Sequence, residues 1–443
     1  MPDTLFTTDA MRAVFSDRVR IQRMLDFEAA LAQAQAAVGV IPQDVADVIA
    51  AHCNADRFDA AALAAAARSA GNLAIPLVAA LTRSVAAADP VARGYVHWGA
   101  TSQDVIDTGL VLQLKDALAL IDVDVERLAA ALAMQARRHA ATVLAGRTWL
   151  QQAIPMTLGV KLAGTVNALD RHRQRLAELE GRALVLQFGG AVGTLASLHD
   201  RGLAVSEALA ARLALPLPDL PWHTQRDRVC EVASVLGMLT ATLGKLARDL
   251  ALLSQTEVAE AFEPAAPGRG GSSTMPQKRN PVGASIAIAA AVRVPGLVAT
   301  MLVAAAQEHE RGLGNWPAEW ETLPEIALLV AGAAEAMADV VAGLAVDAER
   351  MRENLELTQG QIHAEAVQMA LAGALGRDRA HALVADACRR AAGEGVHLRE
   401  VLRGMPEVAA ALDAAALDRA FDPANYLGES RRYIERALAA HPV

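Results

Sequence analysis

Residues 268–281 read Gly268-Arg269-Gly270-Gly271-Ser272-Ser273-Thr274-Met275-Pro276-Gln277-Lys278-Arg279-Asn280-Pro281, directly before a long run of Ala, Ile and Val. Three glycines and a serine pair are too flexible for a helix and are typical of a mobile loop. Proline favours the first turn of a helix, so we expect the basic residues where the loop meets a helix N-terminus. Cationic side chains, free N–H groups and the helix dipole favour a carboxylate or phosphate there, beneath a closing lid. The alternative is an ordinary basic turn between helices.

The composition predicts a large helical protein. The 443 residues exceed what one hydrophobic core usually holds, so two or three domains are expected. Hydrophobic residues make up 53% of a chain rich in Ala and Leu, which favours a mostly helical fold. Aromatic residues are only 3% and the net charge is −9, which argues against a nucleic-acid surface or a general polyanion binder. Any anion site must therefore be a local cluster of cations.

Cysteine usage and hydropathy indicate the cellular compartment in which the protein is expected. Cys53, Cys230 and Cys388 stand far apart, and no CxxC or His/Cys metal spacing appears. We therefore expect a reduced, cytoplasmic protein without a metal site. The N-terminus has no secretory pattern, and the longest apolar run near the loop is broken by Arg293 and Pro295. No membrane span is expected.

Hydrophobic periodicity predicts two long helices, over 105–139 and 223–262. In the second, a heptad seam runs from Val229 to Leu253 without interruption. Such a period packs long helices at shallow angles into a bundle. Further helices are expected over 8–38, 155–180, 281–307 and 323–345. We predict an N-terminal helical domain over 1–104, a central bundle carrying the loop over 105–350 and a C-terminal domain of short helices over 351–443.

A second polar segment, His97-Trp98-Gly99-Ala100-Thr101-Ser102-Gln103-Asp104, comes just before the first long helix. One interpretation is an N-cap, in which Thr101, Ser102 or Asp104 bonds to free N–H groups at the start of the helix. The other is a carboxylate site formed by the hydroxyls of Thr101 and Ser102. His97 is a possible contact, although a lone histidine is often only a hydrogen-bonded structural residue.

The string GSSxMPxKxNP within 268–281 resembles the signature loop of the fumarase/aspartase superfamily, and the segment around Thr101 resembles that family's HxGxTSxD region. The resemblance implies that Ser272 moves the proton on the carbon next to a substrate carboxylate. It implies that Lys278 and Asn280 hold that carboxylate and its developing charge, and that Thr101 and Ser102 bind a carboxylate. It also implies an all-α, three-domain homotetramer with sites shared between subunits, and no metal or organic cofactor.

Residues 146–155 resemble the family's second signature, GxTHLQxAxP, but this chain has Trp149 where lyases of the superfamily carry histidine. An indole cannot act as a general acid or base near neutral pH. Arg147, Thr148 and Gln151 remain candidate substrate contacts, although a surface salt bridge is the alternative for Arg147. His223, which precedes the second long helix, is a further possible contact.

A third resemblance, over 307–324, is to the HERDxSxSxxERxxLP pattern of adenylosuccinate lyases. Arg311 matches one arginine of that pattern, while Trp320 replaces another that the resemblance assigns to a nucleotide. Trp149 therefore weakens a lyase reaction that needs the histidine to protonate a leaving group, and Trp320 counts against a phosphorylated nucleotide substrate. Together with these two departures, the resemblance implies lactonisation of a small tricarboxylate diene, in which the nucleophile is one of the substrate's own carboxylates.

Two alternatives remain open at this point. One is a superfamily lyase that releases fumarate from a succinyl-type substrate such as adenylosuccinate. The other is a non-catalytic tetrameric scaffold, which would have no reason to keep Ser272, Lys278 and Asn280 together.

Overall fold

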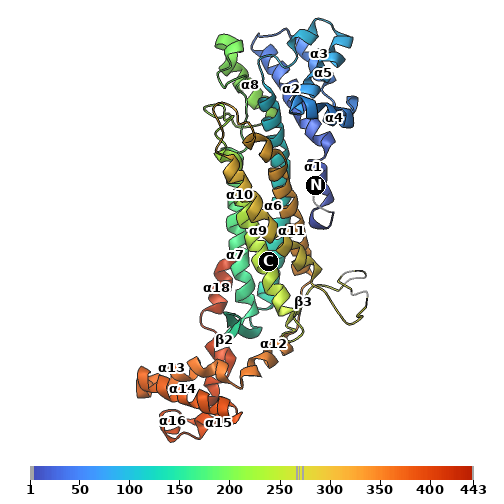
Figure 1. The fold of residues 1–443 in the computed structure, drawn as a ribbon. Helices are drawn as coiled ribbons and strands as arrows, with labels where there is room; N and C mark the ends of the chain where they lie inside the picture. The colour runs from blue at the N-terminus through green and yellow to red at the C-terminus, as the bar shows by residue number, and fades with distance from the viewer. Residues whose placement is uncertain (1–3, 266–267, 269, 272–273, 442–443) are drawn as a thin grey trace. The chain divides into compact units, whose positions relative to one another are not determined.

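The computed structural model describes residues 4–265, 268, 270–271 and 274–441, and they form a mostly helical chain (Figure 1). The all-α class is confirmed. The α-helices are α1 Asp9–Val14, α2 Asp17–Ala37, α3 Gln43–His52, α4 Ala60–Ala70, α5 Ala74–Ala88, α6 Ser102–Arg138, α7 Leu158–Arg182, α8 Gly202–Leu213, α9 Asp227–Leu253, α10 Val282–Ala304, α11 Asn315–Ala342, α12 Ala348–Leu355, α13 Ala364–Leu375, α14 Arg377–Glu394, α15 Leu398–Arg403, α16 Pro406–Ala411, α17 Ala414–Ala420 and α18 Ser430–Ala437.

Short 3-10 helices and strands connect these elements. The 3-10 helices are Thr4–Phe6, Ala55–Arg57, Ala92–Tyr95, Ala196–Arg201, Glu356–Thr358, Gln361–His363 and Pro423–Tyr426. The strands are β1 Val143–Thr148, β2 Gln151–Thr157, β3 Ala261–Phe262 and β4 Ala345–Val346, and they form two antiparallel pairs, β1–β2 and β3–β4.

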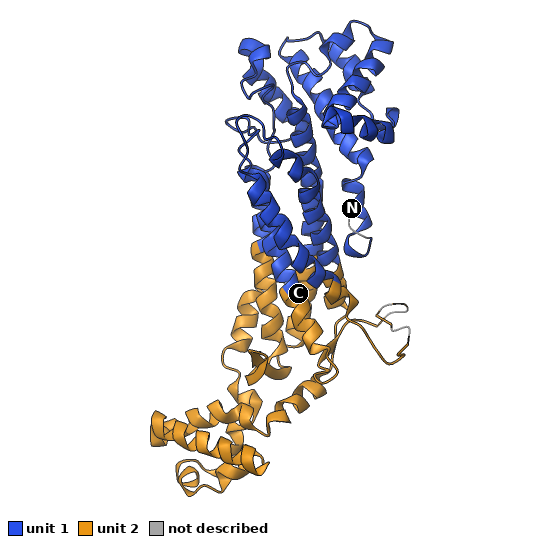
Figure 2. Ribbon diagram, in the orientation of Figure 1, with its two compact units in different colours: residues 1–125, 172–244, 286–335 blue, residues 126–171, 245–285, 336–443 orange. Residues whose placement is uncertain are grey.

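The chain divides into two compact units (Figure 2). Unit 1 comprises residues 1–125, 172–244 and 286–335, and unit 2 comprises residues 126–171, 245–285 and 336–443. Within unit 2, the short helices after β4 enclose a hydrophobic core of their own, which includes Val367, Leu371 and Leu402. The predicted boundaries at 104/105 and 350/351 stay predictions.

The predicted helical seams are buried. In α6 the seam residues from Leu110 to Leu132 are at most 8% exposed, and in α9 those from Val229 to Leu253 are at most 4% exposed. The second helix is shorter than predicted, because the chain turns after Leu253 and reaches β3, which pairs with β4. Sequence periodicity therefore located the seam but overestimated the length of the helix.

Two long helices contain a proline beyond their first turn. Helix α10 continues through Pro295, and α11 begins at Asn315 rather than at the predicted 323 and contains Pro324. The early start has a physical cause, because Trp316 and Glu319 in its first turns are buried against charged partners described below. By length and composition alone, α9 and α10 could each cross a membrane; the apolar window of α9 is 61% buried and that of α10 is 22% buried. Helix α10 therefore continues through Arg293 and Pro295, the two residues that interrupt the apolar run, and the absence of a membrane span stays a prediction.

Helix caps follow the local sequence. The Ser16 hydroxyl accepts from the N–H of Val19 at the start of α2. The side-chain oxygen of Asn72 accepts from the N–H groups of Ala74 and Ile75 at the start of α5. These bonds satisfy helix N–H groups that have no intrahelical partner.

The hairpin β1–β2 was not predicted from the sequence. Its strands pair from Val143↔Thr157 to Thr148↔Gln151, with an irregularity between Ala145 and Arg147. The two residues at its tip, Trp149 and Leu150, both have left-handed φ angles, of 52° and 64°. Glycine or asparagine usually fills such positions, so this turn lacked the usual sequence signal.

Candidate active site

Asp104, in the first turn of α6, joins three segments of unit 1. Its carboxylate accepts from the N–H of Thr101 at 3.0 Å, and from the N–H groups of Gly189 and Gly190 at 3.0 and 2.9 Å. The Nε2 atom of His223 lies 2.7 Å from the same carboxylate. The capping interpretation is therefore correct for Asp104, which fixes the turn before α6 against the glycine-rich segment.

The neighbouring hydroxyls have a different environment. Thr101 and Ser102 are half-buried, and within the described residues neither hydroxyl has a hydrogen-bond partner. The backbone N–H groups of Ser102 and Gln103 likewise have no acceptor in the part of the chain that the structure describes. Two hydroxyls and two N–H groups at the start of a 37-residue helix form a corner suited to a carboxylate.

Arg311 lies beside this corner. Its Nε donates to the side-chain oxygen of Gln103 at 3.0 Å, and one of its terminal nitrogens donates to the carbonyl of Ala191 at 3.1 Å. The glycine-rich segment comes close for a steric reason: a Cβ on Gly190 would lie 2.9 Å from the carbonyl oxygen of Gly99. The structure thus bonds Arg311, one predicted contact, to Gln103, the residue that directly follows the predicted contacts Thr101 and Ser102.

Next to this corner is a fully buried cluster of ion pairs. Arg226 pairs with Asp107 at 2.7 Å and with Glu319 at 2.5 Å, and all three side chains are at most 1% exposed. The indole N–H of Trp316 also donates to Asp107. Burial opposes the charge of Arg226, but Asp107 and Glu319 outweigh it and raise the arginine's pKa, while burial raises the pKa of Glu319. Sequence analysis missed Asp107 and Glu319, since nothing in the motif shows that helices distant in sequence bring them together.

His97 is bonded to a buried acid. Its Nδ1 lies 2.6 Å from a carboxylate oxygen of Glu28, which is 1% exposed, while the other oxygen of Glu28 is buried without a partner among the described residues. His97 has a φ of 60°, in the left-handed region. Burial favours the neutral ring, but Glu28, and then Asp104, outweigh burial and raise the pKa of His97. A positive charge is therefore favoured close to the carboxylate corner.

His223 is 5% exposed and bonds through its ring to Asp104 and through its carbonyl to Gln103. Its partners are groups that shape the corner.

The hairpin in unit 2 holds four predicted residues in two environments. Arg147 donates two hydrogen bonds to Glu260, whose side chain is fully buried, so the ion-pair alternative is the one observed. Thr148 and Gln151 are exposed, and Trp149 at the tip is 97% exposed.

The signature loop also lies in unit 2. Ser272 lies outside the described residues. Lys278 and Asn280 line a cavity of about 190 Å³ together with Glu263. The carboxylate of Glu263 accepts from the N–H groups of Gly283 and Ala284 at the start of α10. The prediction that these N–H groups are free for a ligand is therefore wrong, because a side chain of the chain itself already provides the anion.

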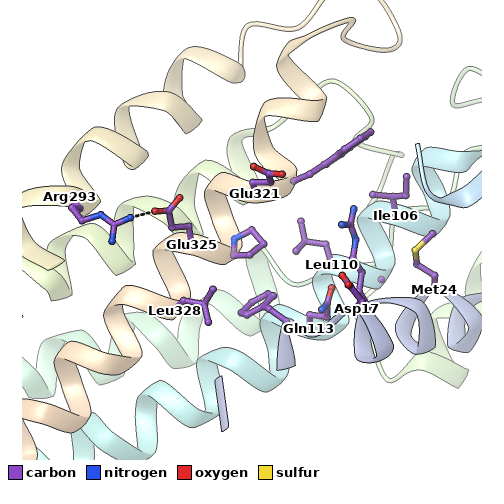
Figure 3. Close-up of a pocket in the computed structure, with 14 residues that line it drawn as sticks. Asp17, Met24, Ile106, Leu110, Gln113, Arg293, Glu321, Glu325 and Leu328 are labelled. Carbon is purple, nitrogen blue, oxygen red and sulfur yellow. Dashed lines mark hydrogen bonds and ion pairs between the residues drawn. The ribbon is translucent and has the colours of Figure 1, made fainter. Parts of the chain in front are cut away.

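A larger cavity, of about 370 Å³, lies elsewhere in unit 1 (Figure 3). Figure 3 shows Arg293 directed toward Glu325, with which it forms an ion pair. Trp320 lines this cavity, and its indole N–H has no acceptor among the described residues. None of the predicted site residues lines it. The described residues also contain no group of His, Cys, Asp or Glu side chains placed to hold a metal ion.

This helical fold, with its hydroxyl and arginine corner and its lysine-bearing loop, is that of a lyase: the chain belongs to the fumarase/aspartase family of lyases. A family model described as lyase matches residues 5–296, and one described as adenylosuccinate lyase C-terminus matches residues 360–437.

Two curated proteins and one solved structure are similar to nearly the whole chain. The chain is 60% identical over 439 residues to the 3-carboxy-cis,cis-muconate cycloisomerase of Pseudomonas aeruginosa, covering 99% of this chain and 96% of that protein. It is 58% identical to the protein of the same name from Pseudomonas putida, over 94% of this chain and 99% of that protein. The crystal structure of the 3-carboxy-cis,cis-muconate lactonizing enzyme from Pseudomonas putida matches with a TM-score of 0.94 and 56% identity, over 99% of this chain and 98% of that chain.

Proposed function

We propose that this protein is an intramolecular lyase that lactonises 3-carboxy-cis,cis-muconate to a carboxymuconolactone, a step in the degradation of protocatechuate. The observation that carries the proposal is the whole-length likeness to proteins named for this substrate. The exposed Trp149 agrees with it, because this reaction needs no side chain to activate water or an amine.

The reaction conserves every atom of the substrate. A carboxylate oxygen of the muconate attacks one carbon of the diene, so a C–O bond forms while a C=C π bond breaks. The electron pair moves to the adjacent carbon and its carboxylate, as an enediolate-like anion. A proton then adds to that carbon and gives the lactone. Holding the nucleophilic carboxylate against the double bond supplies much of the rate through orientation.

In this proposal the corner of unit 1 holds one carboxylate. The free hydroxyls of Thr101 and Ser102 and the free N–H groups of α6 supply neutral donors, and Arg311 supplies a positive charge. Charge-assisted hydrogen bonds from arginine are stronger than neutral ones. The Nδ1 of His97 lies against Glu28, which raises the pKa of His97 and so favours positive charge in the same turn.

The signature loop stabilises the developing negative charge. Because Glu263 already accepts hydrogen bonds from the first N–H groups of α10, the developing negative charge is stabilised by Lys278, Asn280 and backbone groups of the loop. Ser272 is the first candidate proton donor and Lys278 the second. Arg147 is kept as a further contact only through the two hydrogens that its bonds to Glu260 and to the carbonyl of Ala145 leave available. Thr148 and Gln151 remain exposed candidates.

The proposal extends to assembly and location. We propose a homotetramer with sites shared between subunits, three domains as divided above and a cytoplasmic location. Exposed apolar side chains on α10, Val292 at 65% and Val303 at 74%, support a further contact surface on this helix.

A spectrophotometric assay tests the reaction. Purified protein is mixed with 3-carboxy-cis,cis-muconate, and loss of the conjugated-diene absorbance is followed, with adenylosuccinate and argininosuccinate in parallel. Rapid loss with the muconate alone supports the proposal. Fumarate release from a succinyl substrate without muconate turnover would replace it with the lyase alternative.

Two variants test the loop residues in that assay. Lys278→Met should lower kcat by about a hundredfold, as expected on removing one stabilising group from a developing anion. Lys245→Met is the matched control, since Lys245 lies on α9 in an exposed pair with Asp249. Ser272→Ala with near-normal turnover would remove the serine from the mechanism.

A further inference from the structure

Gln103 lies between the buried ion-pair cluster and Arg311. Its side-chain nitrogen donates to the carbonyl of His223 at 2.7 Å and to a carboxylate oxygen of Asp107 at 3.2 Å. Its side-chain oxygen accepts from the Nε of Arg311 at 3.0 Å. We propose that Gln103 is a positioning residue that aims the guanidinium of Arg311 at a substrate carboxylate. This inference rests on the proposed function.

The orientation of the Gln103 amide is determined by its partners. A carbonyl and a carboxylate can only accept, so both require the NH₂ end of the amide. The guanidinium of Arg311 can only donate, so it requires the oxygen end. A reversed amide would break all three bonds, and Gln103 is fully buried, where unmade hydrogen bonds are costly.

The buried ion-pair cluster fixes the orientation of the Gln103 amide. Arg226 and the indole of Trp316 fix Asp107, which in turn faces the Gln103 amide. On the other side of Arg226, Glu319 accepts from the side chain of Gln307 at 2.9 Å. Gln307 precedes Arg311 in the same loop, so the loop is tied to both acids of the cluster.

The consequence is that one edge of the guanidinium is left for a ligand. Gln103 and the carbonyl of Ala191 occupy the edge formed by the Nε and one terminal nitrogen of Arg311. The end formed by the two terminal nitrogens keeps hydrogens available for a carboxylate in the two-bond geometry that arginine favours. Without Gln103, the long arginine side chain would sample several rotamers, and substrate binding would have to restrict them.

A double-mutant cycle tests the inference. Gln103→Met, Arg311→Ala and the double variant are compared with wild-type protein for KM and kcat with 3-carboxy-cis,cis-muconate. Each single change should raise KM by about tenfold or more, as loss of a charge-assisted hydrogen bond predicts. If Gln103 acts through Arg311, the double variant should be no worse than Arg311→Ala. Independent effects that multiply would overturn the inference.

The matched control is Gln113→Met. Gln113 is on the same helix, is 3% exposed and donates its amide to the carbonyl of Val14, away from the corner. Both Gln→Met variants should lower the denaturation midpoint by similar amounts, and only Gln103→Met should change KM. An equal KM change in the two variants would show a merely structural role. If Gln103→Met does not fold, Gln103→Leu, a smaller apolar side chain that also removes the acceptor toward Arg311, replaces it in the cycle.

A binding measurement separates this inference from the proposed reaction. Tricarballylate is a saturated tricarboxylate that cannot be turned over. Calorimetry gives its Kd for the wild type, the two single variants and the double variant, and so the same cycle for binding alone. Wild-type protein that binds tricarballylate but leaves the muconate unchanged would contradict the reaction, and a non-additive cycle in Kd would still support the positioning role. Additive losses of affinity would overturn it, as would wild-type protein that binds no tricarboxylate.

Discussion

Arg147 and Glu260 meet inside unit 2 through two hydrogen bonds, of 2.6 and 2.9 Å, although 113 residues separate them. Glu260 is fully buried and also accepts from the side-chain amide of Asn354. The hairpin, the segment before the signature loop and α12 are therefore joined by one buried carboxylate.

Breaking this pair should destabilise the protein. Arg147→Met leaves the Glu260 carboxylate buried without its cation, and we expect a loss of about 3 kcal/mol in the free energy of unfolding, measured by urea denaturation. Adding Glu260→Gln should recover most of the loss, because the buried charge is then removed. Arg18→Met is the control: its pair with Asp56 is mostly exposed, and the unfolding midpoint should not move measurably. An Arg147→Met protein as stable as wild type would show that the pair is not structural.

The pair of His97 and Glu28 predicts a pH dependence of stability. Because the pKa of His97 is raised in the folded protein, its contribution is fully present below its unfolded value of about 6.5 and is lost as the pH rises through the folded value. The stability difference between wild type and His97→Gln, measured by urea denaturation, should therefore be larger at pH 6 than at pH 8. Glu28→Gln should lower the pKa of His97, followed by NMR of the imidazole, since Asp104 is then the only one of the two acids left to oppose burial. No change in that pKa would exclude Glu28 as the cause.

The close approach of Gly270 to Asn280 predicts the effect of a substitution in the loop. The carbonyl of Gly270 accepts from the N–H of Asn280 at 2.8 Å, and a Cβ on Gly270 would lie 2.6 Å from the Asn280 carbonyl oxygen. Gly270→Ala should displace Asn280 and lower kcat by at least about tenfold, with little change in the unfolding midpoint. Gly268→Ala is matched, because its φ is also left-handed but no atom of the described residues lies within 4 Å of the added carbon. Equal effects of the two changes would point to backbone strain instead of contact with Asn280.

The exposed Trp149 predicts a spectroscopic signature of assembly. Subtracting the fluorescence of Trp149→Phe from that of wild type isolates the emission of this indole. In the proposed homotetramer with shared sites, the tip of the hairpin is covered by another subunit. Raising the protein concentration should then convert monomer to tetramer, which light scattering measures as an increase in mass. The emission maximum of Trp149 should shift to the blue over the same range of concentration. A monomeric mass with red-shifted emission at all concentrations would contradict the proposed assembly.

Local sequence predicted those features that depend on neighbours along the chain. The heptad seam of α9 and the apolar steps of α6 are buried as expected, because helical period alone decides which side chains share a face. Asn72 caps α5, since an Asx side chain reaches N–H groups two and three residues ahead. The family was also evident from the loop and the HxGxTSxD region.

Other features depended on contacts that no local pattern reveals. The hairpin turn at Trp149 and Leu150 carries no glycine or asparagine, so its left-handed residues gave no signal. The early start of α11 depends on burial of Glu319 against Arg226, 93 residues away. At the start of α11 a tertiary contact overrode local preference.

The sequence by itself determined the helical class, the positions of the long helices and the residue types available for chemistry. Only the tertiary structure decided which of those residues have internal partners. Arg147 is paired with Glu260, the first N–H groups of α10 are taken by Glu263, and Arg311 is directed by Gln103. The physical reason is that a charge or hydrogen-bond donor is available to a ligand only if no partner from a distant segment has already satisfied it.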